Sequence, residues 1–320
     1  MILVRPAKAY APELQKHFQD CSQEFLDWQD RDPGRVLNLR CSSLPFCPVN
    51  LFYQIGTLGT SQSLDMNSMY FTRVGTTVHT VMQTALVRNG DRIFGDWYCP
   101  KCKITEHMSL FRSCTKCQRP MQYEELAIDY RGIKGHVDTL FVPKSQVKYA
   151  QQVSQLPEAE RYEAAKRLRL VIVDYKTCSI SNSAAKKRNP GATYKSQIRA
   201  YAWLLTKQYG LQIDSTILMF LPRDNPNRPV YWEQVWTADD MPKLGRLLKR
   251  WKQAHTDALT ARSWSEVKAL LDDYGSCAGE YCKVCASSNV KTMLRQAFKD
   301  AQAEERLPIG DFMRREMGVA

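Results

Sequence analysis

The chain has 320 residues, of which 44% are hydrophobic, so it can form one large domain or two ordinary ones and is not expected to be disordered. A formal net charge of +12 favours a polyanionic partner, and nucleic acid is the usual one. No segment approaches the roughly 20 apolar residues that cross a bilayer, and no secretory pattern opens the chain. We therefore expect a cytoplasmic or nucleoid-associated protein, or one in the host cytoplasm if a phage encodes it. In such a compartment eleven cysteines favour metal ligands over disulfides.

Four regions are expected along the chain. A mainly helical N-terminal region, residues 1–95, has apolar residues at helical spacing over 12–28, and a second helix is expected over 72–88. A cysteine-rich insertion follows at 96–121. A core of strands and helices spans 122–240, and a mainly helical C-terminal region spans 241–320.

Strands and helices alternate within the predicted core. Two strands with a turn near Tyr130-Arg-Gly132 are expected between residues 122 and 143. The later elements are a polar helical insertion at 144–168, a buried strand at 170–175, a mobile basic loop at 179–191, an amphipathic helix at 194–209 closed by Gly210, and strands at 215–221 and 231–236.

A carboxylate and a lysine stand two positions apart at the end of the buried strand, as Asp174-Tyr-Lys176. Residues i and i+2 of a strand point to the same face, so these two side chains should project together. Asp138, in Gly135-His-Val-Asp138, is a second carboxylate in a strand-like setting. Two acids that share one hard cation, with an ammonium beside them, are the minimum equipment for metal-dependent phosphodiester hydrolysis.

Four segments occur in one order: Gly75-Thr-Thr-Val-His79, Gly135-His-Val-Asp138, Asp174-Tyr-Lys176 and Gln197-Ile-Arg-Ala-Tyr201. This order resembles the RecB-like branch of the PD-(D/E)XK nuclease superfamily, over about residues 70–240. The resemblance implies an α/β fold with a restriction-endonuclease-like core, in which helices flank a mixed central sheet. Each segment alone has an ordinary explanation; two residues at i and i+4 of a helix, for example, can simply hydrogen-bond to each other.

The resemblance also implies roles for individual residues. Lys176 would position the attacking water or stabilise developing charge, while Gln197 and Tyr201 would orient Lys176 and the DNA backbone. One or two Mg²⁺ or Mn²⁺ ions would be held by a shared set of ligands, which are His79, Asp138, Asp174 and the backbone carbonyl of Tyr175.

One acid of the family pattern is missing from this chain. Where the family often has a glutamate four residues after the histidine, this chain has Gln83. Glu124 and Glu125 precede the Asp138 strand and are both candidates to support the site. The motif does not decide between them.

Two pairs of cysteines form the pattern C-x2-C-x11-C-x2-C, which is typical of a zinc ribbon. Four thiolates at this spacing can reach one tetrahedral Zn²⁺ ion. A structural staple and a contact with DNA or a partner are equally good interpretations of such an insertion. The four ligands are Cys99, Cys102, Cys114 and Cys117.

A second cysteine group is split between the two ends of the chain. Some RecB-like nucleases, including AddB and the CRISPR-associated spacer-acquisition nuclease, hold a [4Fe–4S] cluster with one N-terminal and three C-terminal cysteines. The family usually has C-x2-C-x5-C at the C-terminus, whereas this chain has C-x4-C-x2-C, so a second Zn²⁺ is the alternative. Cys41 can replace or join the N-terminal member. The resemblance implies that the helical termini are joined by Cys47, Cys277, Cys282 and Cys285.

Five basic residues follow the catalytic strand and are candidate contacts for DNA phosphates; they are Lys186, Lys187, Arg188, Lys195 and Arg199. The resemblance implies a metal-dependent DNA exonuclease of the two-metal type, acting on single-stranded ends in recombination, repair or replication. A structure-selective or nicking endonuclease of the same fold and a non-catalytic zinc-ribbon DNA-binding adaptor are the alternatives. No GxxxxGK[ST] motif is present, so a helicase or recombination partner would be a separate chain.

Overall fold

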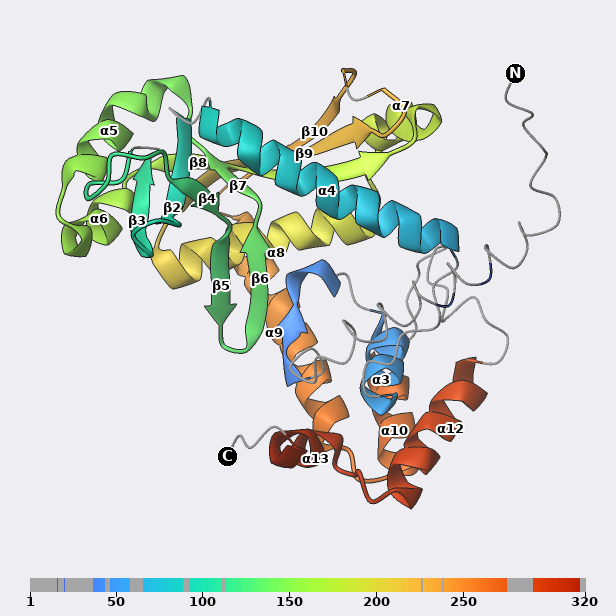
Figure 1. The fold of residues 1–320 in the computed structure, drawn as a ribbon. Helices are drawn as coiled ribbons and strands as arrows, with labels where there is room; N and C mark the ends of the chain where they lie inside the picture. The colour runs from blue at the N-terminus through green and yellow to red at the C-terminus, as the bar shows by residue number, and fades with distance from the viewer. Residues whose placement is uncertain are drawn as a thin grey trace, which may run out of the picture.

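A mixed β-sheet flanked by helices is the centre of the fold (Figure 1). Within the described ranges its strand order is β10-β9-β8-β7-β2-β3, with β4 paired to β2. The computed structural model describes Lys16, Asp20 and residues 37–43, 47–57, 66–88, 92–110, 113–225, 227–237, 239–274 and 290–316. The strands are β2 (Ile93–Cys99), β3 (Ile104–Leu110), β4 (Gln122–Glu124), β7 (Thr139–Phe141), β8 (Arg169–Cys178), β9 (Gln212–Pro222) and β10 (Val230–Val235).

The central strand β8 forms where the sequence predicted a buried strand. Its run of branched and apolar residues suits a pleated surface that is covered on both sides, and Leu170 and Ile172 are fully buried. β8 pairs in parallel with β9 and antiparallel with β7. The parallel pair requires a crossover connection, which here consists of α7 (Ile180–Arg188) and α8 (Ala192–Tyr209).

A smaller sheet of order β1-β6-β5 stands beside the central one. The turn between its two longer strands was predicted, and it falls at Arg131 and Gly132, whose φ angles of 53° and 73° are both positive. Two successive positive φ angles are typical of a tight two-residue hairpin. The strands are β1 (Leu39–Arg40), β5 (Leu126–Tyr130) and β6 (Ile133–Val137).

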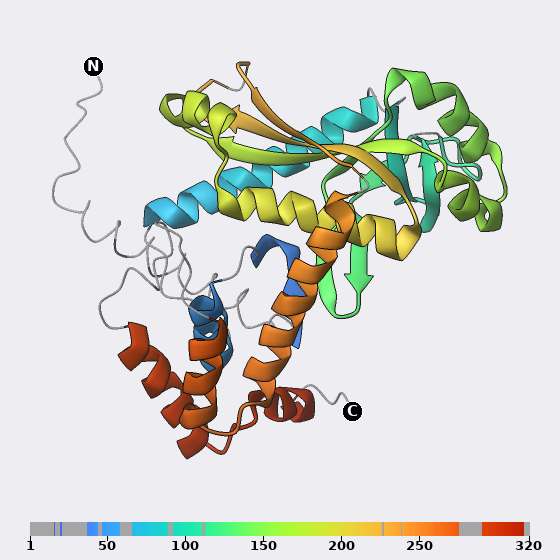
Figure 2. The same cartoon turned by 180° about the vertical axis from the view of Figure 1, so that it is seen from behind.

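Two long helices cover opposite faces of the central sheet. α4 (Met66–Arg88) crosses one face (Figure 1), and α8 crosses the other (Figure 2). Both were predicted, although α4 starts several residues earlier than expected. Gly210 adopts a left-handed φ of 72° and ends α8, as the sequence indicated.

The basic segment 179–191 was predicted to be a mobile loop, and this prediction was wrong. The structure forms α7 there, with the Ile180 N–H donating to the Asp224 carboxylate at 2.9 Å. A carboxylate at a helix N-terminus and basic residues in the last turn both stabilise a short helix through its dipole. The capping residue lies far along the chain, so the local sequence did not reveal it.

The polar segment after β7 forms helices that pack on β3. α5 holds the edge of β3 through the Ser154 hydroxyl, which accepts a 2.8 Å hydrogen bond from the Leu110 N–H. α6 contributes the buried Arg161, which lies 3.2 Å from the Glu106 carboxylate. The elements are a 3₁₀ turn, Lys144–Gln146, α5 (Val147–Gln155) and α6 (Glu158–Ala165).

The remaining helices form a bundle below the sheet (Figure 2). The N-terminal α3 packs against the C-terminal α12 so closely that a Cβ added at Gly56 would lie 2.9 Å from the Phe298 ring. None of the helices in the described parts of the chain is both long and apolar enough to span a membrane. The helices are α3 (Pro48–Gly56), α9 (Asp240–Thr260), α10 (Trp264–Tyr274), α12 (Val290–Ala303) and α13 (Ile309–Glu316).

Candidate active site

Asp138 occupies the point where the chain crosses from one sheet to the other. β7 pairs with β8 up to Thr139 opposite Val173, but Val137, which would continue the ladder, pairs instead with a strand of the smaller sheet. The backbone N–H of Tyr175 is therefore left without a strand partner on this side. It donates to Asp138 Oδ2 at 2.8 Å. The crossing thus places a buried carboxylate at a gap beside β8.

Asp174 and Lys176 project together from β8, as their spacing predicted. Lys176 Nζ lies 2.7 Å from Asp174 Oδ2 and 5.6 Å from the ring centre of Tyr194 on α8. Asp174 is completely buried, and its Oδ1 has no hydrogen-bond partner among the described residues. A buried carboxylate oxygen without a donor is costly in a folded protein. Such an oxygen is a good position for a cation ligand.

A second group of possible ligands meets at Asp138. His79 on α4 brings its Nδ1 to 3.4 Å from Asp138 Oδ2. Glu125 follows β4 directly, and one ligand atom from each of these three residues lies within 4.8 Å of the other two. Within the described ranges this three-residue group does not include Asp174, although the charge of Asp174 acts on both Asp138 and His79.

Glu125 is the acid that the sequence left undecided. Glu124 lies in β4, is exposed, and accepts a 3.5 Å hydrogen bond from Thr105. The next residue faces the other way, as strand geometry requires, and reaches the His79–Asp138 group. Only the pairing of β4 with β2 distinguishes the two, and no signal in the local sequence contains that information.

Burial and mutual repulsion shift the ionisation of both aspartates. Burial, reinforced by the negative charge of Asp174, raises the pKa of Asp138 well above its usual 3.8. Burial also raises the pKa of Asp174, although Lys176 opposes the shift. Crowded buried carboxylates bind protons tightly when no cation neutralises them. The site therefore favours a divalent cation.

The two basic groups respond in opposite directions. Burial lowers the pKa of His79 below 6.5, and the charge of Lys176 acts the same way, so the imidazole is neutral near pH 7 and can serve as a ligand. Burial alone would lower the pKa of Lys176, but the attraction of Asp174 and Asp138 outweighs it and the pKa is raised. Lys176 therefore keeps its positive charge.

The donor set fits Mg²⁺ or Mn²⁺. These ions prefer oxygen ligands, and imidazole suits Mn²⁺ better than Mg²⁺. A strand residue directs its N–H and C=O to the same side, so the carbonyl of Tyr175 faces the same gap as the N–H that binds Asp138. Asp138 and the Tyr175 backbone thus meet at one gap in the sheet, where His79 and Glu125 approach Asp138.

Gln197 and Tyr201 lie buried on α8, where Gln197 Nε2 donates to the Tyr201 hydroxyl at 2.9 Å. This is the simple i, i+4 pairing that the sequence left open. Tyr201 also packs closely against Gly135, since a Cβ added there would lie 2.9 Å from its ring. The pair therefore ties α8 to the strand that leads to Asp138.

The basic residues after β8 divide into two groups. Lys186, in the last turn of α7, lies 5.3 Å from the Tyr194 ring that Lys176 also approaches. Lys187 and Arg188 follow on the same turn and are exposed. Lys195 and Arg199 lie on α8 instead and contact β10, through the Trp232 ring at 5.4 Å and Gln234 Oε1 at 3.2 Å.

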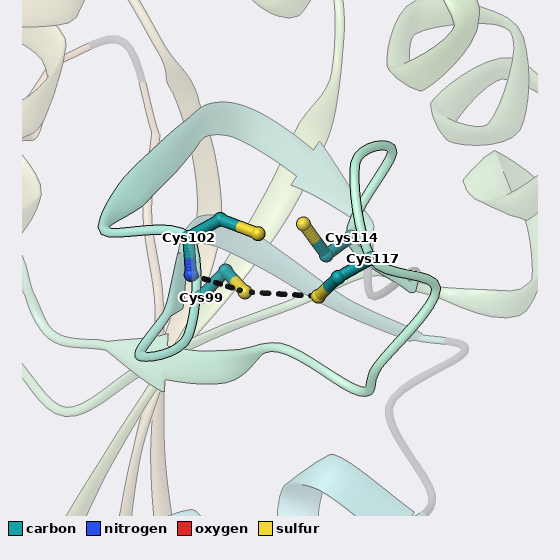
Figure 3. Close-up of side chains that lie close together, drawn as sticks. All are labelled: Cys99, Cys102, Cys114 and Cys117. Carbon is teal, nitrogen blue, oxygen red and sulfur yellow. Dashed lines mark hydrogen bonds between the residues drawn. The ribbon is translucent and has the colours of Figure 1, made fainter.

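The four cysteines of the C-x2-C-x11-C-x2-C pattern converge as predicted (Figure 3). Their sulfurs lie within 4.8 Å of one another, and Cys99 Sγ lies 3.6 Å from Cys117 Sγ. Burial raises the pKa of Cys114, but the amides of Cys117 and Lys116 and the other thiols outweigh it and bring the pKa to about 6. A thiol that ionises near neutral pH is a ready metal ligand. The neighbouring thiols raise the pKa of Cys102 to about 12 instead, so only one thiol of this close pair ionises readily without a metal. Four converging cysteines can hold zinc or another thiophilic metal centre.

The two halves of the cluster share one backbone geometry. The Lys103 N–H donates to the carbonyl of Cys99 at 2.7 Å, and the Gln118 N–H donates to that of Cys114 at 2.8 Å. Lys103 and Gln118 both have positive φ, 53° and 58°. Each half is therefore a tight turn that exposes its sulfurs to the same point.

The terminal cysteine group is described only in part. Cys277, Cys282 and Cys285 lie outside the described residues. Cys47 is buried directly before α3. Cys41 packs into the core, with its Sγ 3.0 Å from a Cβ added at Gly135, and burial raises its pKa to about 12.

Comparison with known proteins gives a distant likeness of shape. No protein-family profile matches the chain, and no curated protein sequence matches it. The crystal structure of SSO0001 is similar with a TM-score of 0.36 and 14% identity, covering 75% of this chain and 86% of that one. LHK-Exo in complex with dAMP is similar with a TM-score of 0.38 and 7% identity, covering 76% of this chain and 95% of that one. The functional assignment therefore rests on the geometry of the site.

Proposed function

We propose that the protein is a metal-dependent DNA nuclease that shortens single-stranded DNA from its ends. The observation that carries this proposal is the gap beside β8, where Asp138 and the orphaned oxygen of Asp174 lie next to an ammonium that Asp174 holds at 2.7 Å. Mg²⁺ or Mn²⁺ would be held there by Asp138, Asp174, Glu125, His79 and the Tyr175 carbonyl. When bound, such an ion polarises a phosphate and lowers the pKa of a bound water.

The chain's own groups supply the remaining chemistry. Lys176 has a raised pKa, so it acts by charge, binding an anionic phosphate oxygen or orienting the attacking water, and not as a general base. His79 is neutral and can accept a cation or a proton at one ring nitrogen. The basic turn of α7 lies next to Lys176 through the shared Tyr194 ring, and would hold the strand that enters the site.

Digestion of DNA labelled at one end tests the proposal. Single-stranded and duplex substrates, labelled at either the 5′ or the 3′ end, are incubated with Mg²⁺, Mn²⁺ or EDTA. Metal-dependent shortening from one end supports an exonuclease and gives its polarity. Discrete internal fragments would instead indicate an endonuclease, and retention of intact DNA in every metal would indicate a DNA-binding adaptor. Asp174→Asn is the control for a contaminating nuclease.

Recombination, repair or replication is the proposed setting, with any helicase on a separate chain. The thiolate group formed by Cys47 and the three C-terminal cysteines is proposed to hold a [4Fe–4S] cluster, or else a second Zn²⁺. Absorbance near 400 nm in protein purified without oxygen would support iron. A colourless protein with two zinc ions per chain would support zinc.

A further inference from the structure

The short segment from Cys117 to Glu125 joins the four-cysteine cluster to the active site. Its first part is fixed to the cluster itself, since the Cys114 N–H donates to the Arg119 carbonyl at 2.8 Å and Ser113 pairs with Pro120. Met121 is fully buried in the apolar cluster that also contains Cys99 and Cys114. Three successive residues of the segment, Arg119, Pro120 and Met121, are thus held beside the cysteines.

The second part of the segment is β4, which pairs with the strand that carries Cys99. Tyr123 lies opposite Trp97, with the two ring centres 5.2 Å apart, and Glu124 lies opposite Asp96. β4 has three residues and pairs with no other strand among the described residues. So short an edge strand is not stable alone. Its position therefore depends on its pairing with the Cys99 strand, on its packing against α4 and on the segment that leaves the cysteines.

Glu125 directly follows β4, so a displacement of β4 would also displace the Glu125 carboxylate. The other groups of the site are not joined to the cysteines by so short a segment. His79 comes from α4, Asp138 from the crossing between the sheets, and Asp174 and Lys176 from β8.

We infer that the four-cysteine cluster, with its metal bound, is the positioning element that holds Glu125 in the active site. Loss of the metal from the cysteines would displace one ligand of the catalytic ion and leave the other ligands in place. This inference rests on the proposed function in one respect, that Glu125 binds the catalytic cation. A passive staple would instead lower the stability of the fold and have no specific effect on that cation.

A double-mutant cycle distinguishes the two roles. Cys117→Ser removes a half-buried member of the cluster, Glu125→Gln removes the acid, and the double variant carries both changes. Mn²⁺ affinity is measured by the electron paramagnetic resonance signal of free Mn²⁺, and zinc content by elemental analysis. We expect each single variant to weaken Mn²⁺ binding by roughly 10–100-fold, the range typical of lost support around a metal site. The double variant should be no weaker than the worse single variant.

Two further variants complete the design. Met121→Ala keeps all four thiols and should keep its zinc, yet weaken Mn²⁺ binding in the same direction, and it provides the test if Cys117→Ser does not fold. Lys101→Ala, an exposed change on the Cys99–Lys103 turn of the cluster, should bind Mn²⁺ like the wild type. Additive losses in the double variant, or wild-type Mn²⁺ affinity in folded Cys117→Ser that has lost its zinc, would overturn the inference. If Cys117→Ser does not fold, wild-type Mn²⁺ affinity in Met121→Ala would overturn it. Because the signal reports binding, wild-type protein that binds Mn²⁺ but does not cut DNA would refute the proposed function alone.

Discussion

The four-cysteine cluster and the carboxylate site assemble their ligands in different ways. The cysteines lie within one short stretch of chain, in two turns of the same backbone geometry, and their spacing alone predicted that they meet. The carboxylate site takes its ligands from several elements that are distant in the sequence, and only the fold brings them together. Local sites can therefore be recognised from spacing, whereas long-range sites depend on the order in which strands pair. The segment that contains β4 joins the two sites. Substitutions in one site can therefore be compared by their effects on the other.

The largest effect is expected from Asp174→Asn, which should impair the carboxylate site and leave the four-cysteine cluster unchanged. Without the carboxylate that holds Lys176 and offers an oxygen to the cation, cleavage should fall by roughly 10²–10³-fold, the range found when one electrostatic group is removed from an active site. Zinc content should not change, because the cysteines lie on other elements. Asp214→Asn, which removes a surface partner of Arg169 at 2.7 Å, is the matched control. Undiminished cutting by purified Asp174→Asn would contradict the assignment.

Metal binding at the carboxylate site should weaken as the pH falls. The pKa values of Asp138 and Asp174 are raised, so protons compete with the cation at a higher pH than for ordinary carboxylates. Mn²⁺ affinity should therefore fall as the pH is lowered through these raised values, by about tenfold per pH unit for each proton that the ion displaces. Calorimetric titration in buffers of different ionisation enthalpy measures the protons released. Mn²⁺ affinity that stayed constant as the pH was lowered to the ordinary carboxylate pKa of 3.8 would be inconsistent with the raised pKa values.

The basic turn of α7 should affect DNA binding more than chemistry. Replacing Lys187 and Arg188 with alanine should weaken single-stranded DNA binding. It should also make the slope of log affinity against log salt concentration shallower by about 0.7 for each phosphate that the protein no longer neutralises. The rate at saturating DNA should change little, because neither side chain reaches the carboxylates. Lys148→Ala with Arg167→Ala, exposed changes on the α5–α6 side, is the charge-matched control. An equal weakening in the control would show that only net charge matters.

The smallest effect is expected from Tyr201→Phe. Removing the hydroxyl leaves the buried Gln197 amide without this partner, which should lower the free energy of unfolding by about 1 kcal/mol. Cleavage should stay within a few-fold of the wild-type rate if the pair acts by holding α8 in place. Denaturant unfolding and initial rates together check this. A loss of rate as large as that of Asp174→Asn would instead assign the hydroxyl to the chemistry.

Particular residues show how far the sequence could predict this molecule. The apolar run of β8 predicted a buried strand and the joint projection of Asp174 and Lys176, and Gly210 marked the end of α8, because these signals are local. The helix α7 was missed because its capping acid, Asp224, lies on the far side of a helix and a strand. Glu125 could not be chosen over Glu124 because their difference depends on the pairing of β4 with β2.

Anomalous diffraction from crystals grown with Mn²⁺ is the most direct test of the central claim, that carboxylates from separate strands hold one divalent ion. We predict a manganese peak in contact with Asp138 and with at least one of Asp174 and Glu125, and a separate zinc peak among the four ribbon cysteines. A crystal with metal at the cysteines but none beside Asp138 at saturating Mn²⁺ would contradict the account.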